Sequence, residues 1–103
     1  PSNDAKSVSA NHLFIIILKK DKISISRNKM MQELYKNKII TQIHYIPVFM
    51  HPYYKKICKG NFQGAKEYYS NCISLPIFAN LTKKELNHIL KCLGKILVKN
   101  NKK

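Results

Sequence analysis

The stretch HYIPVFMHPYY, residues 44–54, constrains the fold of this chain more than any other. Its prolines, Pro47 and Pro52, fix φ and push the residues before them into extended geometry, so the stretch predicts a stiff, irregular crossing and not a helix. It also holds two of the four histidines and three of the six tyrosines. Such a loop is suited to present His and Tyr to a ligand, but the same side chains often seal the edge of a core. Both interpretations stay open at this level.

Three short apolar runs predict extended segments around this crossing. Residues 12–18, HLFIIIL, are rich in β-branched residues and continuously apolar, which is typical of a strand covered on both faces. Residues 39–45 are again strand-like and lead directly into the loop. A third piece, residues 73–78, contains Pro76, which confines it to an edge or to the end of a strand.

Helical periodicity predicts a helix on the N-terminal side of the loop and two short helices after it. The first helix is capped by Ser24 or Ser26 and ends near Asn37. Short helices are predicted for residues 53–59, where Pro52 suits the first turn, and for residues 65–72.

The last predicted helix has the clearest local signal. Thr82 and Glu85, in the order Thr-Lys-Lys-Glu, form the pattern of a capping box. Apolar side chains then repeat at helical spacing, and we expect them to pack on the core: Leu86, Ile89, Leu90, Leu93, Ile96 and Leu97. The order of segments predicts an α+β domain of two to three strands with covering helices.

A chain of 103 residues has room for one domain. Residues 1–10 are interpreted as a lead-in or a severed linker, and residues 99–103 as a Lys/Asn tail. No apolar run approaches the ~20 residues of a membrane span, and no secretory leader is visible, so we expect no membrane contact. Cys58, Cys72 and Cys92 form no Cys-x-x-Cys pair, which favours reduced thiols in a cytoplasmic protein over a disulfide framework or a zinc site.

The formal net charge of +14 makes nucleic acid a partner to consider. Arg27 is the one arginine among the 19 basic residues, whereas phosphate and base recognition favour the bidentate guanidinium. The lysines are also scattered along the chain, as an AT-rich coding sequence would produce. Nucleic acid is therefore not the partner that we expect, and a non-catalytic basic binding or partner-docking domain stays open as the alternative function.

Two ordered motifs are similar to those of a known family. QIHYIPV at residues 42–48 is followed by HPYY at residues 51–54, and then by ISLPIF at residues 73–78 with Leu-Thr before the last helix. This order resembles the C-terminal part of the DegT/DnrJ/StrS sugar aminotransferases. Within them it looks most like the transaminases that act on UDP-linked 4-keto-6-deoxy-hexoses in bacterial surface-sugar pathways.

The resemblance implies the type I aminotransferase fold, with residues 11–98 as its small C-terminal domain. Members use pyridoxal 5'-phosphate to move an amino group from an amino-acid donor to a keto nucleotide-sugar, and they work as homodimers. The large domain that carries the Schiff-base lysine is absent from this sequence, so we assign no catalytic, cofactor-binding or metal-binding residue. We expect the isolated chain to bind no cofactor, to be inactive, and to need a large catalytic domain in the same protein or as a partner chain.

The resemblance also gives candidate substrate-binding residues, which are His44, Tyr45 and Tyr54. The family commonly reads H-Y-x-P-x-H, and Phe49 stands here in place of the second histidine, so that a polar contact is lost. His51 lies two residues further on and receives no role.

Other positions are expected to be structural. Glycines that are common around residues 38–40 in the family are missing, so a positive φ there would strain Lys38 or Ile40. Arg27 is interpreted as a charge at the start of a helix, with the binding of a carboxylate or phosphate as the alternative. His12 and His88 have no partner visible in the sequence and are treated as structural.

Overall fold

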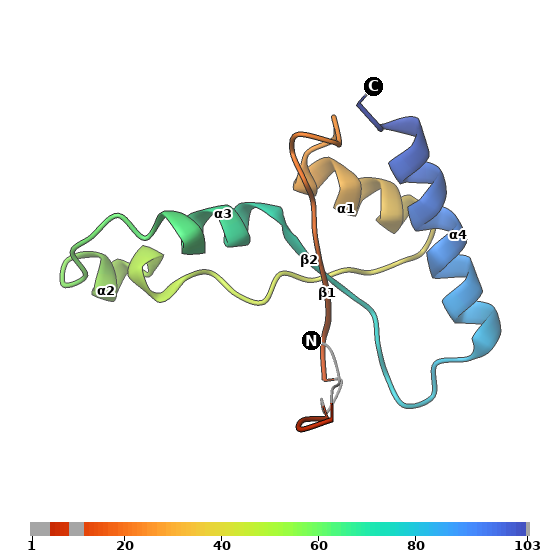
Figure 1. The fold of residues 1–103 in the computed structure, drawn as a ribbon, viewed down its shortest axis with the longest axis horizontal. Helices are drawn as coiled ribbons and strands as arrows, with labels where there is room; N and C mark the ends of the chain where they lie inside the picture. The colour runs from red at the N-terminus through yellow and green to blue at the C-terminus, as the bar shows by residue number, and fades with distance from the viewer. Residues whose placement is uncertain (1–4, 9–11, 103) are drawn as a thin grey trace.

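The computed structural model describes residues 5–8 and 12–102. Most of the predicted lead-in, residues 1–10, therefore lies outside the described residues, as does Lys103 of the predicted tail. The elements follow one another as shown in Figure 1: β1 (Phe14–Ile17), α1 (Arg27–Lys36), the 3-10 helix η1 (Val48–Met50), α2 (Pro52–Lys55), α3 (Gln63–Asn71), β2 (Cys72–Leu75) and α4 (Lys83–Lys99). This confirms the predicted α+β class.

The sheet is built on β2. It pairs with β1 in an antiparallel register that runs from Phe14 opposite Leu75 to Ile17 opposite Cys72. On its other side the backbone groups of Ser74 exchange two hydrogen bonds with those of Gln42, with N···O distances of 3.1 and 2.8 Å. β2 is buried along its whole length because it is flanked on both sides. It ends directly before Pro76, as predicted.

Two predictions about extended segments are wrong. β1 is not covered on both faces, since Phe14 and Ile17 are each 56% exposed; it is the outer strand of the sheet. Residues 39–45 form no strand, and in the described chain they pair with β2 through the single bridge at Gln42. The Ile39 N–H donates to the Leu34 carbonyl at the end of α1, at 3.0 Å, and is therefore not available to a sheet.

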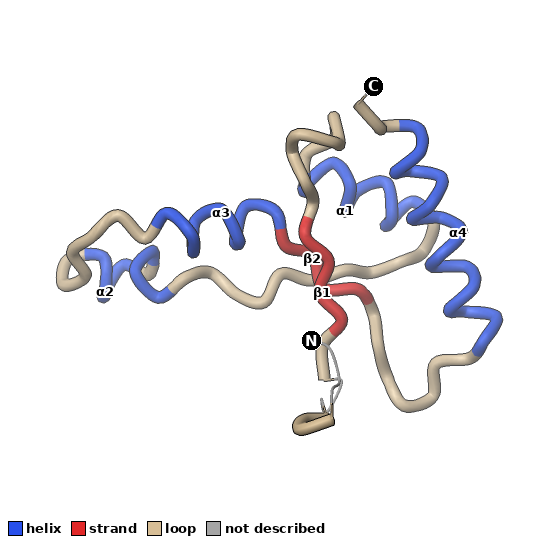
Figure 2. The backbone as a smooth tube through the Cα atoms, in the orientation of Figure 1, coloured by secondary structure: helices blue, strands red, loops and turns tan. Residues whose placement is uncertain are grey.

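The hydrophobic core lies where α1 and α4 meet one face of the sheet (Figure 2). Met30 and Leu34 of α1 and Ile73 of β2 are completely buried. Burial of side chains of this size contributes about 1.5–3 kcal/mol each. The core also contains Leu18, Ile39, Leu75, Ile89, Cys92 and Ile96.

Local hydrogen bonds determine where α1 begins and ends. Ser26 is the N-cap, and its hydroxyl accepts a hydrogen bond from the Lys29 amide. At the other end the Lys38 amide donates to Tyr35 O and the Ile39 amide to Leu34 O, which is the Schellman pattern. Lys38 has φ of 64° at the position where glycine is preferred. The strain expected from the missing glycines is thus located at Lys38.

α4 has the predicted capping box. The Glu85 amide donates to Thr82 Oγ1 at 3.1 Å, and the Thr82 amide donates to Glu85 Oε2 at 3.0 Å. The apolar stripe is only partly buried, because Leu86 and Leu90 are 43% and 55% exposed and Cys92 lies in the core instead.

The predicted Lys/Asn tail begins within α4, which ends at Lys99. Ser24 N donates to Asn100 O and Lys102 N to Lys22 O, each at 2.8 Å. Residues 100–102 therefore lie against the segment before α1 and close that end of the core.

Residues 46–71, which contain η1, α2 and α3, form a projection that we call the arm; it extends to the left in Figure 1. Pro52 is the first residue of α2, as predicted, and no residue of α3 is buried. The radius of gyration is 16.0 Å, against about 13 Å for a compact domain of this length. The arm accounts for this extended shape because it adds length without adding to the core. No helix of the described residues has the length and apolar content to cross a membrane.

Candidate functional site

A cavity of about 490 Å³ lies beside the segment that leads into the arm. His44 and Tyr45, two of the three predicted site residues, line it. Its other lining residues are His12, Leu13, Ile40, Gln42, Ser74, Leu75, Pro76, Ile77 and Phe78. The polar groups among them are imidazole, amide, phenol and hydroxyl, and none of these described side chains is a lysine, an arginine or a carboxylate. Such a lining is suited to hydrogen bonding with a neutral, hydroxylated ligand.

The register of the sheet explains why these residues meet. Ile73 and Leu75 of β2 belong to the core, so Ser74 between them faces the opposite side of the sheet. Gln42 is paired directly with Ser74. His44 follows Gln42 by two residues and therefore lies on the same side, diagonally across from Ser74.

A side-chain hydrogen bond joins two lining residues of the cavity. His44 Nδ1 and Ser74 Oγ are 2.8 Å apart, and Ser74 is only 5% exposed. The Tyr45 ring meets the His44 ring edge-on, with centroids 4.6 Å apart, and the peptide bond between the two residues is cis. Tyr45 is 72% exposed. The site thus combines a held imidazole with an exposed phenol.

The third predicted residue is not part of this cavity. Tyr54 lies in α2 on the arm, where its ring contacts Tyr53 edge-on with centroids 5.0 Å apart. Phe49 is also on the arm and stacks on Phe62, with centroids 4.6 Å apart and an angle of 15° between the rings. His51 Nε2 lies 3.2 Å from Ile46 O. Neither Phe49 nor His51 is among the residues that line the His44 cavity.

Of the three residues treated as structural, Arg27 and His88 join helices, whereas His12 lines the cavity. The Arg27 guanidinium donates to the Tyr69 carbonyl and lies 4.9 Å from the centre of the Tyr69 ring, so it ties α1 to α3. His88 Nε2 donates to Asn37 O at 2.9 Å and so joins α4 to the end of α1. His12 differs from both, because it is exposed and lines the His44 cavity.

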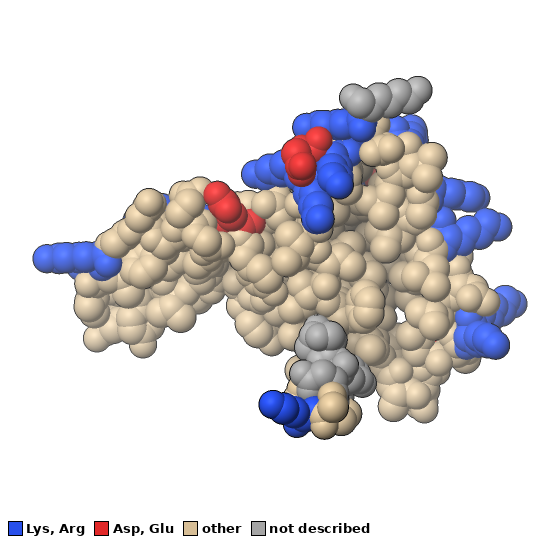
Figure 3. Space-filling model, viewed as in Figure 1, with Lys and Arg blue, Asp and Glu red and all other residues tan. Residues whose placement is uncertain are grey.

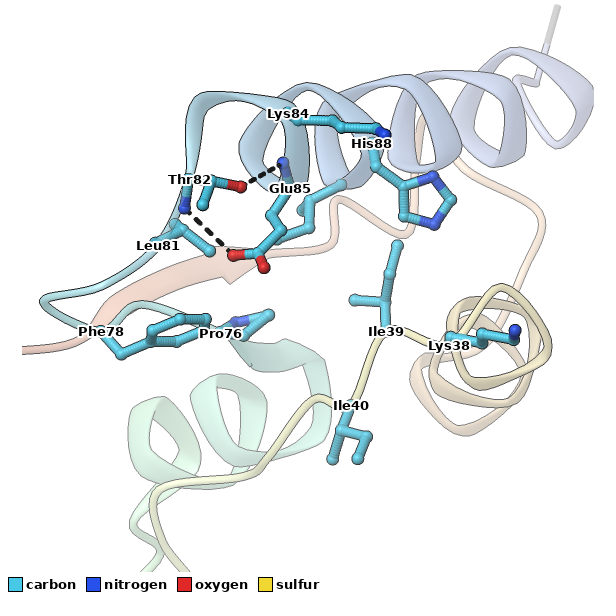
Figure 4. Close-up of a pocket in the computed structure, with 11 residues that line it drawn as sticks. Lys38, Ile39, Ile40, Pro76, Phe78, Leu81, Thr82, Lys84, Glu85 and His88 are labelled. Carbon is cyan, nitrogen blue, oxygen red and sulfur yellow. Dashed lines mark hydrogen bonds between the residues drawn. The ribbon is translucent and has the colours of Figure 1, made fainter.

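A second cavity, of about 650 Å³, lies between the start of α4 and the segment after α1 (Figure 4). It shares Ile40, Pro76 and Phe78 with the His44 cavity. Three of its polar side chains are engaged: Thr82 and Glu85 bond each other in the capping box, and His88 bonds the end of α1. Lys38 and Lys84 also line it. What remains free on its walls is mainly apolar surface.

Three lining residues of the His44 cavity, Ser74, Gln42 and His12, are not among the predicted site residues. A polar residue between two isoleucine or leucine neighbours, as in Ile73-Ser74-Leu75, is a signal that could have pointed to Ser74. Gln42 and His12 carry no comparable signal, since only the pairing with β2 brings them to the cavity.

The residues that line the His44 cavity do not fit pyridoxal phosphate. The described lining offers no lysine for a Schiff base and no carboxylate for the pyridine nitrogen. The second cavity is lined by Lys38 and Lys84 and by Glu85, whose Oε2 accepts a hydrogen bond from the Thr82 amide. No group of three or more His, Cys, Asp or Glu side chains among the described residues could hold a metal ion.

Comparison with known proteins finds similarity to aminotransferases. The DegT/DnrJ/EryC1/StrS aminotransferase family profile matches residues 1–94. The chain is 35% identical over 92 residues to an uncharacterised protein of Methanocaldococcus jannaschii, covering 86% of this chain and 24% of that protein. It is 29% identical over 85 residues to the UDP-4-amino-4,6-dideoxy-N-acetyl-beta-L-altrosamine transaminase of Helicobacter pylori, covering 82% of this chain and 22% of that enzyme.

Comparison of the fold with solved structures also finds aminotransferases. The chain superposes with a TM-score of 0.78 on the Helicobacter pylori aminotransferase PseC, which is involved in the biosynthesis of pseudoaminic acid; the sequences are 26% identical, and the match covers 88% of this chain and 24% of PseC. A putative sugar aminotransferase of Streptococcus pneumoniae matches with a TM-score of 0.73 and 28% identity, covering 88% of this chain and 23% of that protein. The chain thus spans about a quarter of the length of the relatives that it matches.

Proposed function

We propose that this chain, which belongs to the DegT/DnrJ/EryC1/StrS aminotransferase family, is the small domain of a pyridoxal-phosphate-dependent nucleotide-sugar aminotransferase. The observation that carries this proposal is the superposition on PseC, which includes 88% of this chain and 24% of that enzyme. In this proposal the chain positions the sugar, and a large domain holds the cofactor. The absence of cofactor-holding groups from the described lining of the His44 cavity supports this division of roles.

The proposed substrate-binding residues are His44, Tyr45 and Tyr54. The imidazole of His44 and the phenol of Tyr45 offer hydrogen bonds to sugar oxygens in a cavity whose described lining includes no lysine, arginine or carboxylate. A diphosphate would be served better by Arg or Lys, so we assign the sugar ring to this cavity. Tyr54 lies on the arm and would reach the substrate only if the arm lies along the cleft of the full enzyme.

The arm supports a need for a partner domain. It exposes a series of apolar side chains, each at least 40% accessible: Ile46, Val48, Met50, Tyr53, Tyr54, Ile57, Phe62 and Tyr68. In the view of Figure 3, basic side chains lie at the periphery of the molecule, and a broad area without charged side chains occupies the centre. Exposed apolar surfaces of this kind mark interaction sites. We propose that the large catalytic domain covers the arm, whether it belongs to the same protein or to a partner chain.

This arrangement also separates the proposal from its alternative. A non-catalytic docking domain would expose the same apolar surface, but it would not need the held imidazole of His44.

The free thiols of Cys58, Cys72 and Cys92 are consistent with a reducing, cytoplasmic location. We also extend to this chain the homodimeric assembly implied by the family resemblance.

A chimeric enzyme tests the proposed function. The C-terminal quarter of the Helicobacter pylori transaminase is replaced by this chain, and amino transfer to its keto sugar is followed by mass spectrometry. We expect the chimera to transfer the amino group at a rate above that of the same enzyme without its C-terminal quarter. Retention of pyridoxal phosphate by the purified chimera shows that the large domain is intact.

Two variants of the chimera make the result specific. His44→Phe removes the hydrogen bond to the sugar and is expected to lower kcat/KM about fivefold, since such bonds contribute about 1 kcal/mol. Ser24→Ala, which removes a hydroxyl bonded to Asn100 O on the far side of the core, is the matched control and should leave kcat/KM unchanged. A chimera that keeps its cofactor but transfers no amino group would contradict the proposal. An unchanged kcat/KM in the His44→Phe variant of the chimera would also contradict it.

A further inference from the structure

Ser74 is a buried polar residue in an otherwise apolar strand. Its neighbours Ile73 and Leu75 belong to the core, and Ser74 itself is 5% exposed. Both of its backbone hydrogen-bonding groups are used by Gln42. A hydroxyl buried to this extent costs roughly 1–3 kcal/mol when it has no partner. Its partner is His44 Nδ1, at 2.8 Å.

A count of protons selects one arrangement of this hydrogen bond. If Nδ1 carried the proton, Ser74 Oγ would accept it, and the hydroxyl proton would need a second acceptor. In the described part of the chain, the hydrogen bond of this hydroxyl is the one to His44. If the hydroxyl instead donates to an unprotonated Nδ1, both the hydroxyl proton and the Nδ1 lone pair are satisfied within the pair. A neutral imidazole then carries its proton on Nε2.

We propose that Ser74 is a positioning residue for His44: its hydroxyl donates to Nδ1 and fixes the ring in the tautomer that carries the proton on Nε2. The Nε2–H is then the donor that the ring offers to a ligand in the cavity. The ligand atom that it recognises must be an acceptor, such as the hydroxyl or keto oxygen of a sugar. This last step rests on the proposed function, whereas the fixed tautomer does not.

The tautomer can be measured directly on this chain. Long-range ¹H–¹⁵N correlation spectra of protein with ¹⁵N-labelled histidine distinguish protonated from unprotonated ring nitrogens at each site. At a pH where the ring is neutral, we expect the His44 Nδ1 to be unprotonated and Nε2 to carry the proton. A wild-type spectrum that shows the opposite tautomer, or an even mixture, would overturn the proposal without any variant.

A matched pair of variants tests the role of the hydroxyl. Ser74→Thr and Ser74→Val introduce side chains of nearly the same shape that suit a strand, and they differ in the hydroxyl. We expect Ser74→Thr to keep the wild-type tautomer ratio and Ser74→Val to lower it about fivefold, the change that corresponds to a hydrogen bond worth about 1 kcal/mol. An equal ratio in the two variants would refute a positioning role.

His88 serves as an internal control for folding. It donates through Nε2 to Asn37 O and does not line the His44 cavity, so its signals should be the same in all variants. Ser24→Ala provides a second control, because it removes a hydroxyl that bonds Asn100 O. A variant that disturbs His88 is misfolded, and the wild-type spectrum, in which the opposite tautomer would overturn the proposal, then remains as the test.

Failure of this inference can be told apart from failure of the proposed function. An inactive chimera with a fixed His44 tautomer would contradict the enzyme role and leave the positioning role intact. An active chimera with an unfixed tautomer would contradict the positioning role alone. In an active chimera we further expect Ser74→Val to raise KM for the keto sugar about fivefold and Ser74→Thr to leave it unchanged.

Discussion

Replacement of Lys38 by glycine should stabilise this fold. Lys38 closes the Schellman motif at the end of α1 with φ of 64°, a conformation that costs an L-residue about 1–2 kcal/mol. Glycine removes that cost but loses more conformational freedom on folding, by about 0.5–1 kcal/mol. The net gain expected for Lys38→Gly is therefore about 0.5–1 kcal/mol.

Urea unfolding followed by circular dichroism measures this gain as a shift of the midpoint with an unchanged slope. For a chain of this size, the corresponding rise in Tm is about 2–8 °C. Lys38→Ala is the control, because it removes the same charged side chain and keeps the Cβ atom that makes φ unfavourable. We expect its stability to be close to that of the wild type. Equal stability of the glycine and alanine variants would refute the assignment of strain to Lys38.

Two further predictions concern α1 and the arm. The pKa of Glu33 is lowered, first by its hydrogen bond to Lys36. Its contribution to the free energy of unfolding is therefore present above its usual pKa of 4.5 and is lost as the pH falls through the lower folded value. In urea titrations at several pH values, Glu33→Gln should reduce this loss of stability at acid pH. Phe49→His replaces a ring that stacks on Phe62 and lies outside the His44 cavity, so we expect the NMR signals of the arm to shift and those of His44 to stay unchanged; movement of the His44 signals would place Phe49 at the site.

Local features of the fold could be predicted from the sequence because a few neighbouring residues determine them. Thr82 and Glu85 cap α4 as expected, and Ser26, one of the two predicted candidates, caps α1, since each cap needs only a hydroxyl or carboxylate three residues from an amide. Pro76 lies directly after the end of β2, which is one of the two positions predicted for it, because proline lacks the N–H that a sheet requires. The strain at Lys38 was also expected, as one of two positions.

Features that depend on distant contacts could not be predicted in this way. Residues 39–45 have strand-like composition, but the end of α1 takes the Ile39 amide and leaves one bridge at Gln42. The apolar repeat of α4 does not distinguish Leu90, which is exposed, from residues that face the core. An apolar run such as residues 12–18 likewise cannot show whether a further domain covers its second face.

The candidate site shows the same division. His44 and Tyr45 share a cavity because they are adjacent in the sequence, whereas Tyr54 is separated from them by the turn into the arm. Ser74 is 30 residues from His44, and only the pairing of Gln42 with β2 brings the two side chains together. A sequence motif that names His44 therefore does not reveal the residue that holds it.

The central claim is that this chain positions the sugar and leaves the cofactor to another domain, and one measurement on the isolated protein tests it directly. The chain is incubated with pyridoxal phosphate, reduced with borohydride and digested for mass spectrometry. We predict weak labelling spread over the exposed lysines, with no lysine modified stoichiometrically, because the described lining of the His44 cavity contains no lysine and the two lysines of the second cavity, Lys38 and Lys84, are exposed. Stoichiometric labelling of a single lysine would contradict the claim and would place a cofactor site in this chain.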